Sequence, residues 1–267
     1  MCLRLIPIGI TLIFCGVVSA IGNSYFIIQS NHLNEKLGRL PIPITFFLVI
    51  YDMGKTHFGN IHYKFANKLG GSGSRHCAPT IGIAVSMIFS VICCIVAAKV
   101  EARRLGVVIS HSLMDKPDDK IPMSIFWLLP QFVLLGAADG ILETSLTYFL
   151  VDQVGPSMQG HIAHFGIGVT GMGQMGSVLA VYVAGKVSEK GGKTGWFQHT
   201  LNKSRLDKYY WTLAWLSAVN LGVYVVMVLL YSYQKSRIVE DQGALEEEDD
   251  NGTQGHFQDD AQCFCCC

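Results

Sequence analysis

The sequence predicts an all-α membrane protein with about six transmembrane helices, and three observations lead to this fold class. Of the 267 residues, 50% are hydrophobic and only 15% are charged, whereas soluble domains carry about 25% charged residues. Several apolar runs are long enough to cross the roughly 30 Å hydrocarbon core of a bilayer as helices. The alternating ten-residue segments of a membrane β-barrel do not occur in the sequence, so helices are expected to satisfy the backbone in lipid.

Five apolar segments have the length and composition of membrane-crossing helices. In chain order they are residues 6–28, 81–98, 124–151, 162–185 and 209–233. A sixth segment, residues 40–51, is strongly apolar but too short to cross alone. It is expected to tilt, to recruit neighbouring residues or to stay out of the membrane.

The chain divides into a membrane domain and a tail. Residues 1–235 are predicted to form the membrane domain, a six-helix half bundle whose second span is short. Residues 236–267 include a run of five consecutive acids, residues 246–250. Such charge blocks are normally solvated and disordered, so an acidic, disordered tail that ends in a cysteine cluster is predicted.

The cysteine cluster at the end of the tail suggests lipidation. Its members are Cys263, Cys265, Cys266 and Cys267. Prenylation of the CaaX type needs a cysteine fourth from the end, and Phe264 occupies that position. S-acylation, or prenylation at the last two cysteines, stays open. No cysteine or histidine set has the spacing of a metal site, so no metal is predicted.

Three glycines in the segment at residues 162–185 spell the dinucleotide-binding pattern GxGxxG. They are Gly166, Gly168 and Gly171. That pattern binds nucleotides only between a strand and a helix of a βαβ unit, and here it lies within an apolar span. The glycines are therefore predicted to allow close helix packing or a hinge.

Two asparagines match the N-glycosylation pattern, Asn202 in Asn-Lys-Ser and Asn251 in Asn-Gly-Thr. The first lies close to a predicted span and the second in a tail placed on the cytosolic side.

Two carboxylates interrupt the apolar segment at residues 124–151. Asp139 and Glu143 are four residues apart and therefore share one face of a helix. An ionised carboxylate at the bilayer centre costs at least about 2.5–3.5 kcal/mol on insertion scales, and such residues usually mark a functional pathway. A pair that binds and releases a proton near neutral pH would suit proton-coupled transport. The alternative is a structural role, with one acid neutral or hydrogen-bonded to Thr144, Ser145 or a partner helix.

Five motifs together carry a family resemblance. The longest is PMSIFWLLPQFVLLGAAD, at residues 122–139. The others are RLIPI at 4–8, IYD at 50–52, FLVDQV at 149–154 and GWFQHTLNKSRLDKYYWTLAWLS at 195–217. In this order they resemble the second half of the plant nitrate/peptide transporter family, the proton-dependent oligopeptide transporters (PTR2/POT family) of the major facilitator superfamily.

The resemblance implies a fold of two six-helix halves that rock about a central site, with this chain equivalent to the C-terminal half. It also implies proton-coupled uptake of nitrate, small peptides or related organic solutes. Asp139 matches an acidic position on the tenth helix that faces the cavity and, in peptide-carrying relatives, engages the amino group of the substrate. Glu143 is a further candidate for substrate or proton binding, and Tyr25 and Trp127 are weaker candidates for lining the path.

The chain also departs from the family pattern. The first six helices, and with them the ExxER proton motif, are not in this sequence. Tyr148 stands where an acid is common and Met53 where an arginine is common, and Glu143 has no clear family counterpart. The loops that the family places in the cytosol carry fewer lysines and arginines than the other loops, contrary to the positive-inside rule. The orientation therefore stays open.

The sequence thus predicts a proton-coupled secondary transporter, present as its C-terminal half, and not an enzyme. The expected location is the plasma membrane or the vacuolar membrane, and the coupling ion is the proton with no other cofactor. Expected partners are the lipid bilayer, a small solute, and a second half bundle or a full-length relative. Nucleic acid is not expected, because the formal net charge is zero. Two alternatives remain: a non-transporting half that binds or regulates full-length relatives, or an incomplete gene product.

Overall fold

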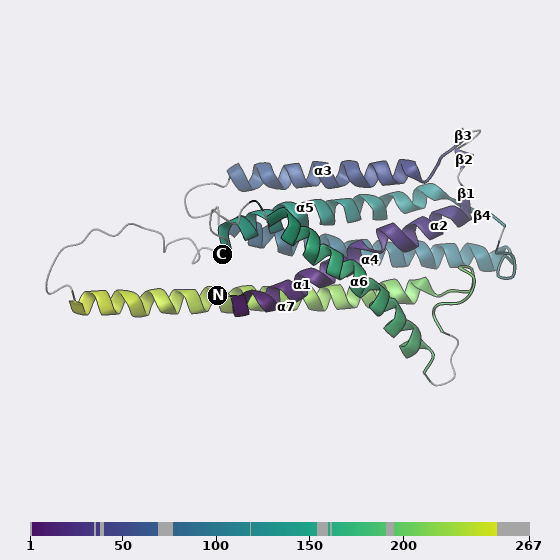
Figure 1. Ribbon diagram of the computed structural model, residues 1–267. Helices are drawn as coiled ribbons and strands as arrows, with labels where there is room; N and C mark the ends of the chain where they lie inside the picture. Colours follow the sequence, from purple (N-terminus) through teal and green to yellow (C-terminus); the bar gives the residue numbers. More distant parts are fainter. Residues whose placement is uncertain are drawn as a thin grey trace.

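Long helices of alternating direction form a bundle in this computed structural model (Figure 1). The structure describes residues 2–34, 36–37, 40–68, 77–117, 119–153, 160, 162–190 and 195–249. Within these residues, five helical spans are long and apolar enough to cross a membrane: Gly9–His32, Ala78–Ser110, Ile125–Val151, Gly166–Ser188 and Leu206–Tyr233. They coincide with the five predicted spans, which confirms the all-α, multi-pass membrane fold.

The first span is a helix with an irregular turn in it. It consists of α1 (Cys2–Ser19), the π-helical segment η1 (Gly22–Phe26) and α2 (Ile27–His32). In the π turn the Phe26 amide donates to the carbonyl oxygen of Ile21 at 3.2 Å, five residues back. Single π turns occur frequently at functional sites, and this one lies between α1 and α2.

The second helix is longer than the sequence predicted. Helix α3 (Thr45–Lys68) has 24 residues, which corresponds to about 36 Å. It begins within the apolar segment 40–51 and recruits the residues that follow it, which is one of the outcomes expected for this segment. The apolar run ends at Tyr51, but the helix continues because one of its faces packs against α5 while polar residues such as Asp52 and Lys64 are exposed. By length α3 could cross a membrane, although its composition differs from that of the five apolar spans.

The remaining helices complete the bundle. They are α4 (Cys77–Ser110), the short 3-10 helix η2 (Ile125–Leu128), α5 (Leu129–Gln153), α6 (Ile162–Ser188) and α7 (Leu206–Asp249). Helix α4 packs against both α5 and α7, and α1 packs against α6. Figure 1 shows α6 crossing the other helices diagonally.

Helix α7 extends well past the rest of the bundle (Figure 1). The backbone is helical to Asp249, so residues 236–249 differ from the predicted disordered tail. Residues 244–248 are all Ala, Leu or Glu, which favour helices, and they support this continuation. The last residues, 250–267, lie outside the described part of the chain, and with them Cys263, Cys265, Cys266 and Cys267.

Two short strand pairs lie at one end of the bundle and were not predicted. Strand β1 (Leu33–Asn34) pairs in parallel with β4 (Ile121–Ser124), and β2 (Lys36–Leu37) pairs antiparallel with β3 (Leu40–Pro41). Leu33 and Ile121 face each other and are fully buried. The first pair therefore ties the end of the first span to the segment that leads into α5.

A pair of glycines allows α1 and α6 to approach closely. A Cβ atom on Gly173 would lie 2.5 Å from the carbonyl oxygen of Ile13 and 2.6 Å from the Cα of Gly16. By contrast, Gly168 and Gly171 of the GxGxxG pattern have no such neighbour within 4 Å. The packing role predicted for this segment therefore falls on Gly173, which is not one of the three glycines of the pattern.

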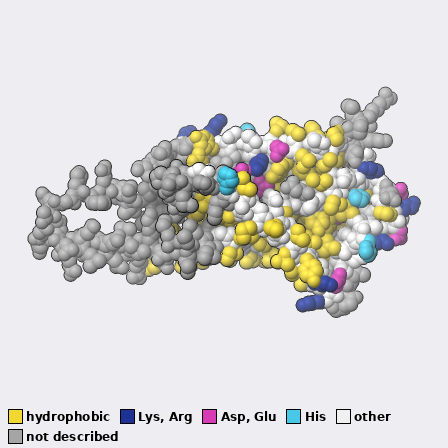
Figure 2. All heavy atoms as spheres, viewed as in Figure 1, with side chains coloured by type: hydrophobic (Ala, Val, Ile, Leu, Met, Phe, Trp, Pro, Cys, Tyr) yellow, Lys and Arg dark blue, Asp and Glu magenta, His cyan; other side chains and the backbone are white. Residues whose placement is uncertain are grey.

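The surface matches a protein surrounded by lipid. In Figure 2 hydrophobic side chains cover much of the middle of the visible face, and charged side chains gather towards the right-hand end. Large apolar side chains are exposed along α6 and α7, for example Met175, Val178 and Trp215, each more than 70% exposed. In water such a surface would favour aggregation, whereas a bilayer or another helical bundle can cover it.

Candidate functional site

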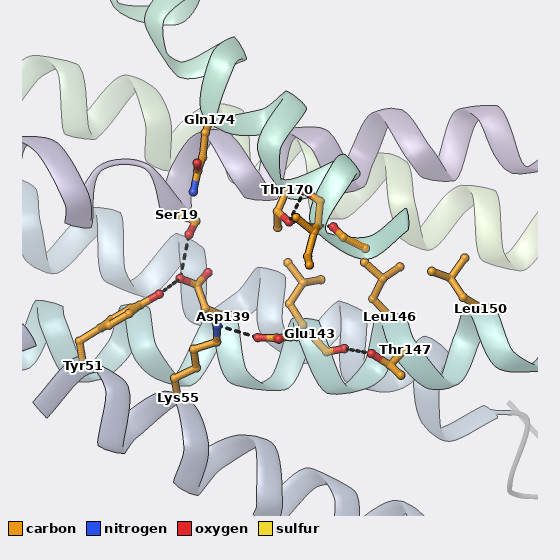
Figure 3. A pocket seen from close by; sticks show the side chains of 13 residues that line it. Ser19, Tyr51, Lys55, Asp139, Glu143, Leu146, Thr147, Leu150, Thr170 and Gln174 are labelled. Carbon is orange, nitrogen blue, oxygen red and sulfur yellow. Dashed lines mark hydrogen bonds and ion pairs between the residues drawn. The ribbon is translucent and has the colours of Figure 1, made fainter. Parts of the chain in front are cut away.

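A cavity of about 350 Å³ lies between α1, α3, α5 and α6. Its polar lining comes from all four helices: Ser19, Tyr51, Lys55, Asp139, Glu143, Thr147, Thr170 and Gln174. Leu142, Leu146 and Leu150 of α5 form an apolar part of the wall. A cavity of this size can hold a small solute, and both predicted acids contribute to it (Figure 3).

Asp139 is partly buried and is held by two neighbouring helices. The hydroxyl of Tyr51 on α3 donates to its Oδ2 atom at 2.6 Å, and the hydroxyl of Ser19 on α1 donates to the same atom at 2.8 Å. Figure 3 shows the carboxyl group between these two side chains. Both donors are uncharged. These two contacts therefore position the carboxylate but do not compensate its negative charge.

The sequence analysis left open a structural role in which one acid is hydrogen-bonded to a partner helix. The bonds that Asp139 accepts from Tyr51 and Ser19 are of this kind. That alternative named Thr144 and Ser145 as well. Thr144 donates instead to the carbonyl oxygen of Gly140, and Ser145 is bonded to the carbonyl oxygen of Ile141 and to His62. Asp139 therefore combines a structural attachment with a position in the cavity wall.

Glu143 forms an ion pair with Lys55, one helical turn away from the Tyr51–Asp139 contact. The Lys55 Nζ and Glu143 Oε2 atoms are 2.7 Å apart, and the two side chains are 38% and 66% exposed. Tyr51 and Lys55 are four residues apart on α3, as Asp139 and Glu143 are on α5. Residues four apart lie on the same face of their helix. Helices α3 and α5 are therefore joined by two contacts, one helical turn apart.

Glycines set the short distance between α3 and α5 that these two contacts require. A Cβ atom on Gly136 would lie 2.5 Å from the carbonyl oxygen of Tyr51, and one on Gly140 would overlap the backbone of Lys55. Small residues at helix interfaces let backbones approach closely in membranes. The stretch GAADG at residues 136–140 therefore positions the acid and also brings its partner helix close.

The two weaker candidates lie elsewhere. Tyr25, in the π turn, packs against Phe197 and Tyr209, with ring centroids 6.0 and 5.7 Å apart. Trp127 is 43% exposed, and the guanidinium carbon of Arg103 lies 4.1 Å from the centre of its ring. Neither residue lines the Asp139 cavity. The structure brings together two of the four candidate residues, Asp139 and Glu143.

A second polar cluster, buried near the strand end of the bundle, was missed by the sequence analysis. Arg104 and Glu101, both on α4 and about 1% exposed or less, form an ion pair of 2.7 Å. Gln29 of α2 donates to Glu101 at 2.7 Å, and Gln131 of α5 donates to Gln29 at 3.4 Å. Arg104 also donates to Asn202 at 3.2 Å. This network joins three helices and the segment before α7.

The potential glycosylation residue Asn202 belongs to this network. Its side chain is 1% exposed, and its amide donates to the carbonyl oxygen of Leu113 at 2.9 Å. A glycan on this nitrogen does not fit the folded structure, because the nitrogen is buried and hydrogen-bonded. Next to it, Lys203 forms an exposed ion pair with Asp115 at 2.7 Å, which holds the pKa of the Asp115 carboxyl below its usual range.

Comparisons with known proteins found similar sequences. Residues 1–197 match the model of the PTR2 (POT) family. The chain is 34% identical to NRT1/PTR FAMILY 5.5 of Arabidopsis thaliana, over 92% of this chain and 46% of that protein. It is 31% identical to NRT1/PTR FAMILY 5.4 of the same plant, over 93% of this chain and 44% of that protein. The chain therefore spans less than half the length of these relatives.

Proposed function

The chain belongs to the POT family, and from this premise we propose that it forms the C-terminal half of a proton-coupled transporter of nitrate, small peptides or related organic solutes. Members of this family are transporters and not enzymes. One observation supports the proposal more than any other. A carboxylate, Asp139, lies in the wall of a cavity between four helices of a membrane bundle. An acid in such a position usually marks a solute or ion pathway.

The proposed role of Asp139 is contact with the solute. Tyr51 and Ser19 fix the carboxyl group but bring no charge, so a solute group that carries a positive charge or donates hydrogen bonds can bind there. Thr170 and Gln174 add neutral polar groups from α6 on the opposite side of the cavity (Figure 3). Coupling to protons would use the same cavity, because it also contains Glu143.

A second half bundle is the proposed partner. Alternating access requires two bundles that move against each other around a site between them, and the described helices supply one. The cavity is bounded by α1, α3, α5 and α6, and α6 carries exposed apolar side chains along its length. An N-terminal half packed against this side would close the cavity and complete the path. The plasma membrane or the vacuolar membrane is the proposed location.

Reconstitution tests the proposal directly. We would place the chain in proteoliposomes, alone and together with the N-terminal six helices of NRT1/PTR FAMILY 5.5. Uptake of labelled nitrate and of a labelled dipeptide is then measured under an imposed proton gradient. The expected result is gradient-dependent uptake of at least one solute by the two halves together. Asp139→Asn should abolish this uptake, whereas Asp119→Asn, which changes an exposed loop carboxylate, should leave it unchanged.

The rival function is a non-transporting partner of full-length relatives. One observation favours it: α6 and α7 expose apolar surface that another bundle could cover. Co-purification with full-length NRT1/PTR FAMILY 5.5, combined with no uptake by the two halves, would support this rival. Uptake that depends on Asp139 would exclude it.

A further inference from the structure

One face of helix α4 changes from apolar to basic near the strand end of the bundle. Ile81, Ile88 and Ile92 on this face are each more than 40% exposed. Lys99 and Arg103 continue the same line along the helix and are exposed as well. The intervals of seven, four, seven and four residues keep all five side chains on one side of an α-helix. The face therefore leads from aliphatic side chains to two cations.

The two cations of this face have no acid as a partner. In the described part of the chain, neither Lys99 nor Arg103 forms an ion pair. Glu101, which lies between them in the sequence, is fully buried on another side of α4 and is bound to Arg104. Side chains four residues apart on a helix have Cβ atoms about 5–6 Å apart. Lys99 and Arg103 can therefore hold one anionic group between them.

Trp127 places these charges at the edge of the membrane. The guanidinium carbon of Arg103 lies 4.1 Å from the centre of its ring, and the indole is 43% exposed. Exposed tryptophans are enriched where the hydrocarbon core meets the lipid headgroups. One turn beyond Arg103, Gly106 has nothing within 4 Å of the place where a Cβ would lie. The guanidinium group is thus oriented by an aromatic ring and open to a headgroup.

We propose that this face of α4 binds an anionic phospholipid, with the phosphate between Lys99 and Arg103 and an acyl chain along Ile92 and Ile88. Both cations can donate charge-assisted hydrogen bonds to phosphate oxygens. Ile88 lies eleven residues before Lys99, which corresponds to about 16 Å along the helix. This is about half of the roughly 30 Å hydrocarbon core, the depth that one acyl chain covers. The inference goes beyond the proposed transport function and does not depend on it.

A phospholipid fits this face better than the other possible occupants. The cavity that a second half bundle would close is lined by α1, α3, α5 and α6 and by no residue of α4, so that role does not require this face. A free phosphate ion would use the two cations and leave the isoleucines without a partner. A soluble protein would have to enter the hydrocarbon to reach Ile88. Only a lipid combines an anionic group with an apolar chain at this spacing.

Native mass spectrometry of the full chain in detergent provides the test. The chain is titrated with phosphatidylglycerol, whose headgroup has a net negative charge, and with phosphatidylcholine of the same acyl chains, whose headgroup has none. The fraction of protein with one bound lipid gives each affinity. A basic residue near an anionic lipid headgroup strengthens binding about fivefold. Phosphatidylglycerol should therefore bind at least about tenfold more tightly than phosphatidylcholine.

Variants assign the residues. Lys99→Gln and Arg103→Gln should each weaken the binding of phosphatidylglycerol about fivefold, and the double variant about 25-fold. The affinity for phosphatidylcholine should not change. The matched control is Lys186→Gln/Arg205→Gln, which removes the same charge from two exposed cations that already have acid partners, and it should bind phosphatidylglycerol as the unmodified chain does.

Circular dichroism checks that each variant is folded. If Lys99→Gln/Arg103→Gln does not fold, each single variant is compared with Lys99→Arg, which keeps the charge and should keep the affinity for phosphatidylglycerol.

Several results would overturn the inference. Equal affinity for the two lipids, or an equal loss in the control variant, would show that no specific site for the headgroup exists. Displacement of phosphatidylglycerol by inorganic phosphate at an equal concentration would show a site for the free anion. The same spectra report the oligomeric state, and a dimer lost in Lys99→Gln/Arg103→Gln without loss of lipid would place a second copy of the chain on this face.

Discussion

Tyr51 of α3 donates a 2.6 Å hydrogen bond to Asp139 of α5, and Ser19 of α1 donates to the same carboxylate oxygen. Three helices that are far apart in the sequence therefore meet at one atom. The contact explains how an acid is retained in an apolar helix: it has hydrogen-bond donors inside the bundle and opens onto a polar cavity.

Removal of the Tyr51 hydroxyl should weaken the bundle. Tyr51→Phe leaves the Asp139 oxygen with one donor, and the loss of a hydrogen bond to a carboxylate is expected to cost about 1–3 kcal/mol of unfolding free energy. Chemical unfolding in detergent, followed by tryptophan fluorescence, measures the change. Tyr182→Phe is the matched control, because Tyr182 is 62% exposed on α6. Equal effects of both substitutions would contradict the importance of the Tyr51–Asp139 contact.

The crossing of α1 and α6 should be sensitive to a single added carbon atom. Gly173→Ala places a Cβ 2.5 Å from the carbonyl oxygen of Ile13, and overpacking of this kind costs about 1–3 kcal/mol. Gly171→Ala, two residues away on α6, meets nothing within 4 Å and should be neutral or slightly stabilising, because alanine favours helix. Thermal unfolding of both variants checks the difference. A Gly173→Ala protein as stable as the Gly171→Ala protein would show that the two helices do not pack this closely.

Removal of one partner of the buried ion pair on α4 should destabilise the protein strongly. Arg104→Met leaves Glu101 charged and buried, with Gln29 as its remaining donor among the residues that the structure describes, and this is expected to cost about 3–5 kcal/mol. The neighbouring change Arg103→Met removes a contact with the exposed ring of Trp127 and should cost about 1 kcal/mol or less. Unfolding curves in detergent distinguish the two. The double variant Glu101→Gln/Arg104→Met should regain part of the loss, and a loss equal to that of Arg104→Met alone would argue against an uncompensated charge.

Asn202 should carry no glycan in the folded protein. Its side chain is buried and bonded to Arg104 and to the carbonyl oxygen of Leu113. When the protein is produced in a eukaryotic host, an endoglycosidase should therefore remove no glycan from Asn202. The electrophoretic mobility of the protein should not shift on account of this residue. Asn202→Ala should destabilise the chain by about 1–3 kcal/mol, because it leaves buried partners unsatisfied, whereas Lys203→Ala should have little effect. A glycan on Asn202 in correctly folded protein would contradict the position of this segment.

Apolar composition was sufficient to predict most of the fold. A span such as residues 81–98 is apolar over its whole length, and in lipid only a helix satisfies its backbone. Helix α3 was not predicted in full, because after Tyr51 polar residues such as Asp52 and Lys64 share the helix with the residues that face α5. The strand pair of Leu33 with Ile121 could not be predicted from local pattern, because its members are nearly 90 residues apart.

From the sequence, only those residues of the site could be predicted that are unusual in an apolar helix. Asp139 and Glu143 stood out because charged residues are costly in an apolar helix. Ser19 and Tyr51 are ordinary residues in such segments, and their role depends on the approach of α1 and α3 to α5. Lys55 follows the apolar run by one helical turn, a position that would have marked it as a partner for Glu143 only if the pairing of α3 with α5 had been known. The Arg104 network was missed for the same reason.

The central claim is that Asp139 faces a water-filled cavity, and cysteine accessibility tests it most directly. Ser19→Cys and Thr170→Cys would each be exposed to a charged, water-soluble thiol reagent in proteoliposomes, with Ser86→Cys as a control, since Ser86 is 1% exposed on α4. The structure predicts rapid labelling of both cavity positions and no labelling of the control. Labelling of Ser19→Cys and Thr170→Cys as slow as that of Ser86→Cys would show that the cavity is closed to water, and it would contradict a transport path past Asp139.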